Sequence, residues 1–283
     1  MTTSITSPQF DSVDADIVLR SCPSPDYSVE FRVHKCILSA ASPFFRDMFS
    51  LPQAPSHPDG GSQVELPPII DVSESAEVLS TLLQFVYPTT RPSIDTLEEL
   101  VLILDAATKY DVTVAIEALR KILVAPSYLE QCPTRVYALA SHFDLDEEAK
   151  LASRYTLRTQ IIDIPLHKDL QLVSPYDYQR LLTLHQTRAA AAEKLLIIPD
   201  EVKCMMCNGT HYGYLLPPKW WDDFQTRATR ELRLRPTTDV IFSLPFLAQS
   251  AKAGCERCAG SILEAHWFLE DLKAKIDALP CMI

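Results

Sequence analysis

Glycine is scarce in this chain, with only six among 283 residues. Phosphate-binding loops and the nucleophile elbows of hydrolases need closely spaced glycines, which let the backbone turn sharply or approach a ligand. The sequence has neither a Gly-rich phosphate loop nor a Gly-x-Ser-x-Gly motif. His34 is a poor candidate for a catalytic base, because its sequence surroundings supply neither a pocket nor a nucleophile. We therefore expect a protein that is not an enzyme.

Positive charge is also in short supply, and the net charge is −11. Lys and Arg number 8 against 17 Asp and Glu in residues 1–125, 8 against 10 in residues 126–200, and 10 against 10 in residues 201–283. Affinity for nucleic acid comes mainly from cationic side chains that neutralise phosphates. The lack of any basic segment therefore argues against nucleic acid as a partner.

Long apolar runs are absent, and none approaches the roughly 20 residues that a membrane-spanning helix needs. The first 16 residues are acidic and polar, unlike a signal peptide. We therefore expect no membrane partner and a cytoplasmic or nuclear location. Thiols stay reduced there, so the eight cysteines are expected to ligate metal or to be buried rather than to form disulfides.

Residues 14–125 carry the pattern of a small sheet covered by helices. The alternation of apolar and polar residues in "YSVEFRVHK" predicts a half-buried strand, paired with "ADIVLRS" through a turn at Pro23–Pro25. A Pro- and Gly-rich loop follows at 51–63, and a third strand is predicted at 64–70.

Helix signals surround these strands. Ser42, followed by Pro43, is the predicted N-cap of a short helix. Thr96 and Glu99 have the spacing of a capping box, and Thr113 is predicted to cap the next helix. Strands followed by helices, one more strand and further helices indicate an α+β domain.

Past this domain the pattern is helical only. Residues 126–199 predict stacked helical hairpins, and residues 200–283 predict a third unit that carries two Cys-x-x-Cys pairs. The expected helices lie at 133–143, 146–158, 175–198, 219–234 and 256–279.

Four ordered segments carry a family resemblance. "DIVLR", "FRVHKCILSAASPFFRDMF", "LLQFVY" and "AATKYDV" have the order and spacing of the BTB/POZ domain between residue 14 and about residue 125. The rest of the chain resembles the tails of BTB-domain proteins of mushroom-forming fungi, with residues 126–199 as a BACK-like region. The resemblance implies a protein–protein interaction module that forms homodimers or recruits a partner. It also implies a substrate adaptor of a cullin-type ubiquitin ligase as a more specific role.

The resemblance assigns structural roles to two polar residues. Asp16 and His34 match the buried polar pair that fixes the junction between sheet and helix in this family, and leaving such groups unpaired is costly. Two departures weaken the dimer and cullin assignments. About 13 residues precede the first predicted strand, so the extra helix and swapped strand of dimeric members are expected to be absent or reduced. The loop 51–63 lacks a hydrophobic-x-Glu element.

The two Cys-x-x-Cys pairs, Cys204 with Cys207 and Cys255 with Cys258, supply four soft thiolates. Four thiolates are the number that a closed tetrahedral zinc site requires. Asn208–Gly209 offers the turn that a metal knuckle needs after the first pair. A helix that starts at Cys258 would direct backbone N–H groups towards the ligands. We therefore predict a structural Zn²⁺ ion held by these four cysteines.

Several alternatives to this site remain at the level of the sequence. His211 or His266 could replace one cysteine, or the thiols could bind no metal. A dithiol oxidoreductase is disfavoured, since "CMMCNGTHYG" leads into a turn rather than a helix beside a βαβ unit. A zinc-containing transcriptional regulator is disfavoured by the neutral charge of residues 201–283. Trp220–Trp221 is interpreted as a core anchor of a helix start rather than a ligand-stacking platform.

Overall fold

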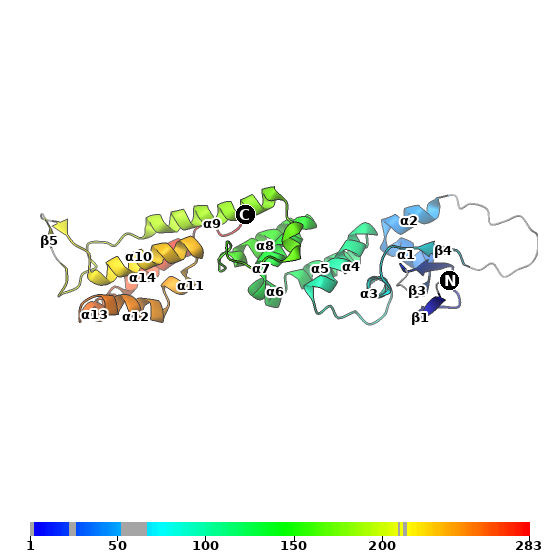
Figure 1. Cartoon of the computed structure of the whole chain (residues 1–283), viewed down its shortest axis with the longest axis horizontal. Coiled ribbons are helices and arrows are strands. Elements are labelled where there is room, and N and C mark those ends of the chain that lie inside the picture. The colour runs from blue at the N-terminus through cyan, green and yellow to red at the C-terminus, as the bar shows by residue number, and fades with distance from the viewer. Residues whose placement is uncertain (1–2, 23–26, 52–66, 209, 212–213) are drawn as a thin grey trace, which may run out of the picture. The chain divides into compact units, whose positions relative to one another are not determined.

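The computed structural model describes residues 3–22, 27–51, 67–208, 210–211 and 214–283. It divides into two compact units, residues 1–123 and residues 124–283, which are coloured blue to green and green to red in Figure 1. Among the described residues, no helix combines the length and apolar composition needed to cross a membrane. The finer division of the chain at residue 199 stays a prediction.

The first unit is built on a four-stranded sheet in the order β1-β3-β2-β4. β2 and β3 form the antiparallel pair that the alternating sequence predicts, while β1 runs parallel to β3 and β4 runs parallel to β2. The predicted Pro23–Pro25 turn lies outside the described residues, as does most of the loop 51–63. The strands are β1 (Thr3–Asp11), β2 (Ile17–Arg20), β3 (Tyr27–Val33) and β4 (Ile69–Asp71).

Strand β1 corrects the prediction that the sheet begins after residue 14. Its sequence, "TSITSPQFD", is polar and contains Pro8, so it gives little strand signal. An edge strand tolerates proline because one side of its backbone needs no partner, and the pairing register shifts between Thr6 and Asp11, around this residue. Phe10 fixes the strand to the core, since its ring is buried 5.9 Å from that of Phe31 and 5.4 Å from that of Tyr87.

The junction between sheet and helix is held by polar contacts, as expected, but it is not buried. Asp16 is exposed, and its Oδ1 accepts a hydrogen bond of 2.7 Å from the backbone N of Lys35. The side chain of His34 keeps 19% of its accessible surface, and its Nε2 lies 3.3 Å from Asp14 Oδ1. The backbone N of His34 donates to the Tyr87 hydroxyl at 2.7 Å. Tyr87, which the sequence did not single out, therefore completes this junction.

Among the described residues, five helices complete the first unit. Their starts follow the cap signals in part: Ser42 accepts from Phe45 N at 3.0 Å, and Thr96 accepts from Glu99 N at 3.1 Å. The prediction for Thr113 is wrong, because the helix begins at this residue rather than after it. The helices are α1 (Lys35–Ala41), α2 (Pro43–Ser50), α3 (Ala76–Val86), α4 (Leu97–Lys109) and α5 (Thr113–Leu123). Helix α3 packs both on β3 and on the helices α1, α4 and α5.

The second unit is helical except for a short hairpin. Its elements are α6 (Pro126–Gln131), α7 (Pro133–His142), α8 (Asp146–Thr156), the 3-10 helix η1 (Lys168–Gln171), α9 (Pro175–Leu195), β5 (Thr210–His211), β6 (Tyr214–Leu215), α10 (Lys219–Leu234), α11 (Thr238–Ile241), α12 (Leu244–Ala253), α13 (Cys258–Glu264) and α14 (His266–Asp277). The helix expected over 256–279 is two helices that meet at Ala265. The sequence patterns did not predict α6, α11 or α12.

Helix α9 is the central element of the second unit. It packs against α10 and α14, which lie beside it in Figure 1. Near its N-terminus, the backbone carbonyl of Asp177 accepts from the Tyr137 hydroxyl of α7 at 2.7 Å. In its middle, His185 Nε2 lies 3.1 Å from Thr156 Oγ1 of α8. Burial lowers the pKa of His185 to about 4, so this histidine is neutral at physiological pH.

Ser42→Ala should lower the free energy of unfolding of the first unit by about 1–3 kcal/mol. The Ser42 side chain is buried, caps α2 and donates to the backbone carbonyl of Tyr110, so its removal leaves two buried groups unpaired. Urea unfolding measures the change. Ser39→Ala is the control, because the Ser39 hydroxyl bonds to no other described group. Equal effects of the two substitutions would contradict this role.

Candidate metal centre

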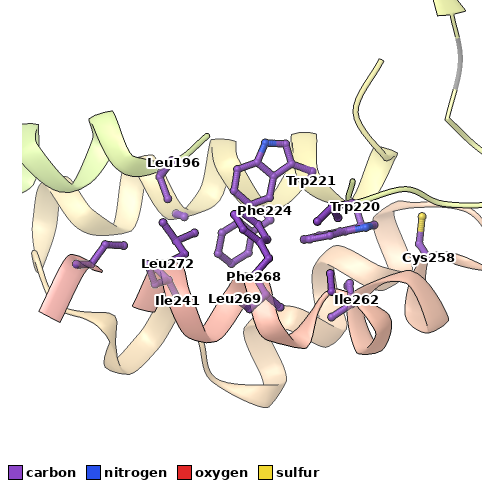
Figure 2. Packing of buried hydrophobic residues seen from close by; sticks show 14 of the residues in the cluster. Leu196, Trp220, Trp221, Phe224, Ile241, Cys258, Ile262, Phe268, Leu269 and Leu272 are labelled. Atoms are coloured by element: carbon purple, nitrogen blue, oxygen red, sulfur yellow. The ribbon is translucent and has the colours of Figure 1, made fainter. Parts of the chain in front are cut away.

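The core of the second unit ends at a group of sulfur atoms. Its aromatic centre comes from α10 and α14, where the rings of Trp221 and Phe268 lie 5.4 Å apart. Figure 2 shows Trp220 at the end of this core next to Cys258. Trp220 and Trp221 are both buried, which confirms that the Trp pair anchors the start of α10 in the core.

The first cysteine pair lies in the connection from α9 to α10. Cys204 is buried, and residues 205–207 form a turn that brings Cys207 back towards it. The Asn208 side chain holds this turn from both sides: Oδ1 accepts from the backbone N of Cys204, and Nδ2 donates to the Leu216 carbonyl at 3.2 Å. Gly209, the second residue of the predicted turn, lies outside the described residues.

The second pair spans the gap between α12 and α13. Cys258 is the first residue of α13, as the sequence predicts, and its backbone N donates to the Cys255 carbonyl at 2.9 Å. Cys255 N in turn donates to Cys258 Sγ at 3.2 Å. Two further bonds fix the surroundings of the site: Trp220 Nε1 donates to Ser261 Oγ at 3.0 Å, and Ser261 Oγ donates to the Lys203 carbonyl at 2.8 Å.

The structure brings all four predicted sulfur atoms together. The Sγ atoms of Cys204 and Cys255 are 3.4 Å apart, those of Cys207 and Cys258 are 3.5 Å apart, and all four lie within 4.8 Å of one another. Cys258 Sγ is 3.7 Å from that of Cys255 and 4.0 Å from that of Cys204. None of these distances approaches the roughly 2.05 Å of a disulfide bond. A tetrahedral Zn–S₄ centre with bonds of about 2.3 Å has sulfur–sulfur edges of about 3.8 Å, so the arrangement fits a single ion.

Backbone N–H groups also point at the sulfurs. Lys219 N donates to Cys207 Sγ at 3.5 Å. Burial raises the pKa of Cys204, but hydrogen bonds from the backbone of Met206 and Cys207 and from the Cys255 thiol outweigh it and lower this pKa to about 7. Burial is also the main reason why the pKa of Cys207 rises to about 12. Without a cation, four adjacent thiolates would repel one another, so some of the sulfurs stay protonated. A divalent cation would remove this repulsion and hold all four as thiolates.

The histidine alternatives gain no support from the described residues. His266 is largely exposed, and its Nε2 lies 3.7 Å from Glu270 Oε1 on the same helix. The group of metal-ligating atoms that converge here consists of four cysteines without it. The side chain of His211 lies outside what the structure describes. Two of the other thiols, Cys22 and Cys36, are exposed, so the expectation that a cysteine without a metal is buried is wrong for them.

Gly254 is a residue of this site that sequence reasoning missed. It ends α12 directly before the second pair, and a Cβ atom built on it would lie 2.7 Å from Cys258 Cβ and clash with Cys258 Sγ as well. Only glycine leaves room for the sulfur at this position. Its place directly before a cysteine pair, in a chain with six glycines, is the signal that could have identified it.

Comparisons with known proteins find one family match, which covers most of the first unit. Residues 9–127 match the model of the BTB/POZ domain, from within β1 to the start of α6. One similar solved structure is the BTB domain of zebrafish PATZ1, with 21% sequence identity and a TM-score of 0.29 over 38% of this chain and 75% of that chain. None of the curated proteins matches. The predicted likeness of the tail to fungal proteins therefore stays a prediction.

Gly254→Ala should weaken metal binding by about tenfold or more, because the added methyl group displaces Cys258 from the sulfur cluster. Titration of the metal-free protein with Co²⁺ under anaerobic conditions, followed by thiolate absorption, measures the affinity. Gly260→Ala is the control, since a Cβ atom there meets nothing within 4 Å. Unchanged affinity in both variants would show that Gly254 has no part in shaping the site.

Proposed function

We propose that this chain, whose residues 9–127 form a BTB/POZ domain, is a non-catalytic interaction protein that self-associates through this domain. BTB domains are protein–protein interaction modules, and the match to this family is the observation that carries the proposal. The second unit is the proposed carrier of a structural zinc ion, supported by its four converging cysteines.

An apolar groove on the first unit is the proposed surface of self-association. It has a volume of about 670 Å³ and lies among α1, α2, α3 and α5. Val114, with 52% of its surface exposed, is its most prominent apolar side chain. The lining residues are Cys36, Ile37, Ala40, Ala41, Pro43, Arg46, Phe85, Val86, Thr113, Val114 and Glu117.

The charges at this groove suit a second copy of the chain. Arg46 on α2 and Glu117 on α5 both line it and are both exposed. In a two-fold dimer every contact between two different residues occurs twice, once in each direction. Arg46 of one copy can therefore face Glu117 of the other copy, and Glu117 of the first copy can face Arg46 of the second. The hydrophobic "FFRDMF" segment offers less exposed apolar surface for self-association than its sequence suggests. Phe45 is buried with its ring stacked 5.2 Å from Tyr110, which leaves Phe44 as the exposed ring.

Val114→Glu should weaken self-association by more than about tenfold, since Arg46 already faces Glu117 of the other copy and a second buried carboxylate lacks a partner. Light scattering on the full chain at several concentrations measures the dimer. Leu102→Glu is the matched control, because Leu102 is 58% exposed on α4 but does not line the groove. A wild-type protein that stays monomeric at all concentrations rejects the proposal.

The role of a cullin-type ligase adaptor is the alternative use of the same domain. No contact of the described residues favours it, and most of the loop 51–63 lies outside them. Co-elution of the monomeric full chain with the N-terminal part of a cullin would support this alternative over self-association.

A zinc ion would fasten the end of the second unit by joining two turns that are far apart in the sequence. The redox alternative is favoured by the pKa of Cys204, since reactive cysteines have lowered pKa values. A dithiol reaction, however, uses two sulfurs, whereas four converge here. The transcriptional alternative finds no support in the balanced charge of residues 201–283.

Purified protein should contain one zinc ion per chain, and removing it should loosen the second unit while the BTB domain stays folded. Metal binding is coupled to folding because the ligands come from distant segments. Elemental analysis measures the metal, and hydrogen exchange should rise in residues 200–283 after chelation or in Cys255→Ser. Cys36→Ser, at an exposed thiol, is the control. Well under one zinc per chain with all four thiols alkylated in the native protein would reject the site.

A further inference from the structure

A polar cavity of about 510 Å³ lies within the second unit, apart from the sulfur cluster. It is bordered by the end of α8, the middle of α9, the start of α11 and the C-terminal part of α14. Its lining residues are Arg154, Tyr155, Leu157, Arg158, Arg188, Thr237, Thr238, Asp239, Lys273, Asp277 and Cys281. Four cationic side chains thus meet two carboxylates, in a chain whose net charge is −11.

Both carboxylates of the cavity already have partners in the protein. Asp239 Oδ2 lies 3.1 Å from Arg158 Nε, and Asp277 Oδ1 accepts from Thr238 Oγ1 at 2.7 Å. They are therefore only partly available to balance the other cations of the cavity.

Arg188 is the buried cation at the cavity wall, with 5% of its surface exposed. Its guanidinium donates to backbone carbonyls only, including those of Pro236 at 2.8 Å and Ile276 at 3.0 Å. Burial lowers its pKa; the electrostatic interactions with Cys281 and Asp277 oppose this in part, and the positive charge of Arg154 lowers the pKa further. The buried charge of Arg188 is therefore met by dipoles rather than by a carboxylate at hydrogen-bonding distance.

Two cations and two hydroxyl groups remain open to a ligand. In the described part of the chain, neither Arg154 nor Lys273 forms an ion pair or a hydrogen bond. The side-chain hydroxyls of Tyr155 and Thr237 likewise have no hydrogen-bond partner among the described residues. All four groups are donors, and all four line the same cavity.

We propose that this cavity binds a dianionic phosphate group through Arg154, Lys273 and the hydroxyls of Tyr155 and Thr237. Guanidinium and ammonium groups are the side chains that bind phosphate oxygens most strongly, and hydroxyl donors complete the coordination. The volume is within the range of small-ligand sites, about 300–1,000 Å³, so it admits a phosphate together with part of the group that carries it. The proposal is independent of self-association and of zinc.

Calorimetric titration of the full chain as purified tests this directly. The probes are inorganic phosphate and a phosphoserine peptide, with sodium chloride at equal ionic strength and the unphosphorylated peptide as references. Binding of phosphate alone indicates a small phosphorylated compound, and binding of the phosphopeptide indicates a phosphorylated protein; either supports the proposal. Binding of neither probe beyond its reference overturns it.

Substitutions of the two open cations localise the binding. Arg154→Gln and Lys273→Gln should each weaken binding by about tenfold, the loss expected for one charged hydrogen bond. Arg230→Gln and Lys252→Gln are the matched controls, since both residues are exposed and line no part of the cavity. Equal affinity in test and control variants would overturn the assignment.

Cys281 lines the cavity, so the reactivity of its thiol is a second, independent measure of the electrostatic potential there. Its rate of alkylation by anionic iodoacetate, divided by the rate with neutral iodoacetamide, reports the local potential and is unaffected by the thiolate fraction. Arg154→Gln and added phosphate should each reduce this ratio by about threefold at Cys281 and leave it unchanged at Cys22, which is exposed and lies outside both this cavity and the self-association groove. A ratio at Cys281 that responds to neither change would contradict an anion site.

Discussion

The meeting of two sulfur pairs across 51 positions of sequence is the constraint on which the second unit depends. Each pair is a tight turn, and each turn is tied to a helix start: Lys219 N contacts Cys207 Sγ, and Cys258 begins α13. The turns therefore set where α10 and α13 begin. The Trp220 side chain then fills the space between these helices, with its indole N–H bonded to Ser261. Ligand geometry, helix placement and core packing are parts of one arrangement.

Local signals made most of this fold predictable. Ser42 and Thr96 cap helices because a short polar side chain directly before a helical pattern can accept a hydrogen bond from an unpaired N–H of the first turn. Strand β3 follows from the alternation in its sequence, whereas β2 is a short apolar run whose three residues Ile17–Leu19 are all buried. The two cysteine pairs could be predicted as candidates for one site because together they supply the four thiolates that a closed zinc site requires. That the four sulfurs converge could be seen only in the folded structure, because the 47 residues between the pairs do not determine how far apart the pairs lie in space.

The features that escaped prediction depend on tertiary contacts. β1 is polar and contains Pro8, and it is a strand only because β3 offers it an edge and Phe31 and Tyr87 enclose Phe10. Asp16 and His34 were predicted correctly to lie at the junction between sheet and helix. They were predicted to be buried, but Asp16 is exposed and His34 is partly exposed, because burial depends on tertiary packing. Gly254 is required by the position of a single sulfur atom. No periodic pattern records a requirement of this kind.

Helix α9 has a consequence for how the second unit can vary in length. It is one continuous helix of 21 residues, and its first half meets α7 and α8 while its second half meets α10 and α14. One inserted residue near its centre would rotate one half against the other by about 100°. Either Arg188 would then turn away from the carbonyls of Pro236 and Ile276, or His185 would turn away from Thr156. Insertions should therefore accumulate in the loops at either end of α9, which acts as a fixed rotational register between the two sets of helices.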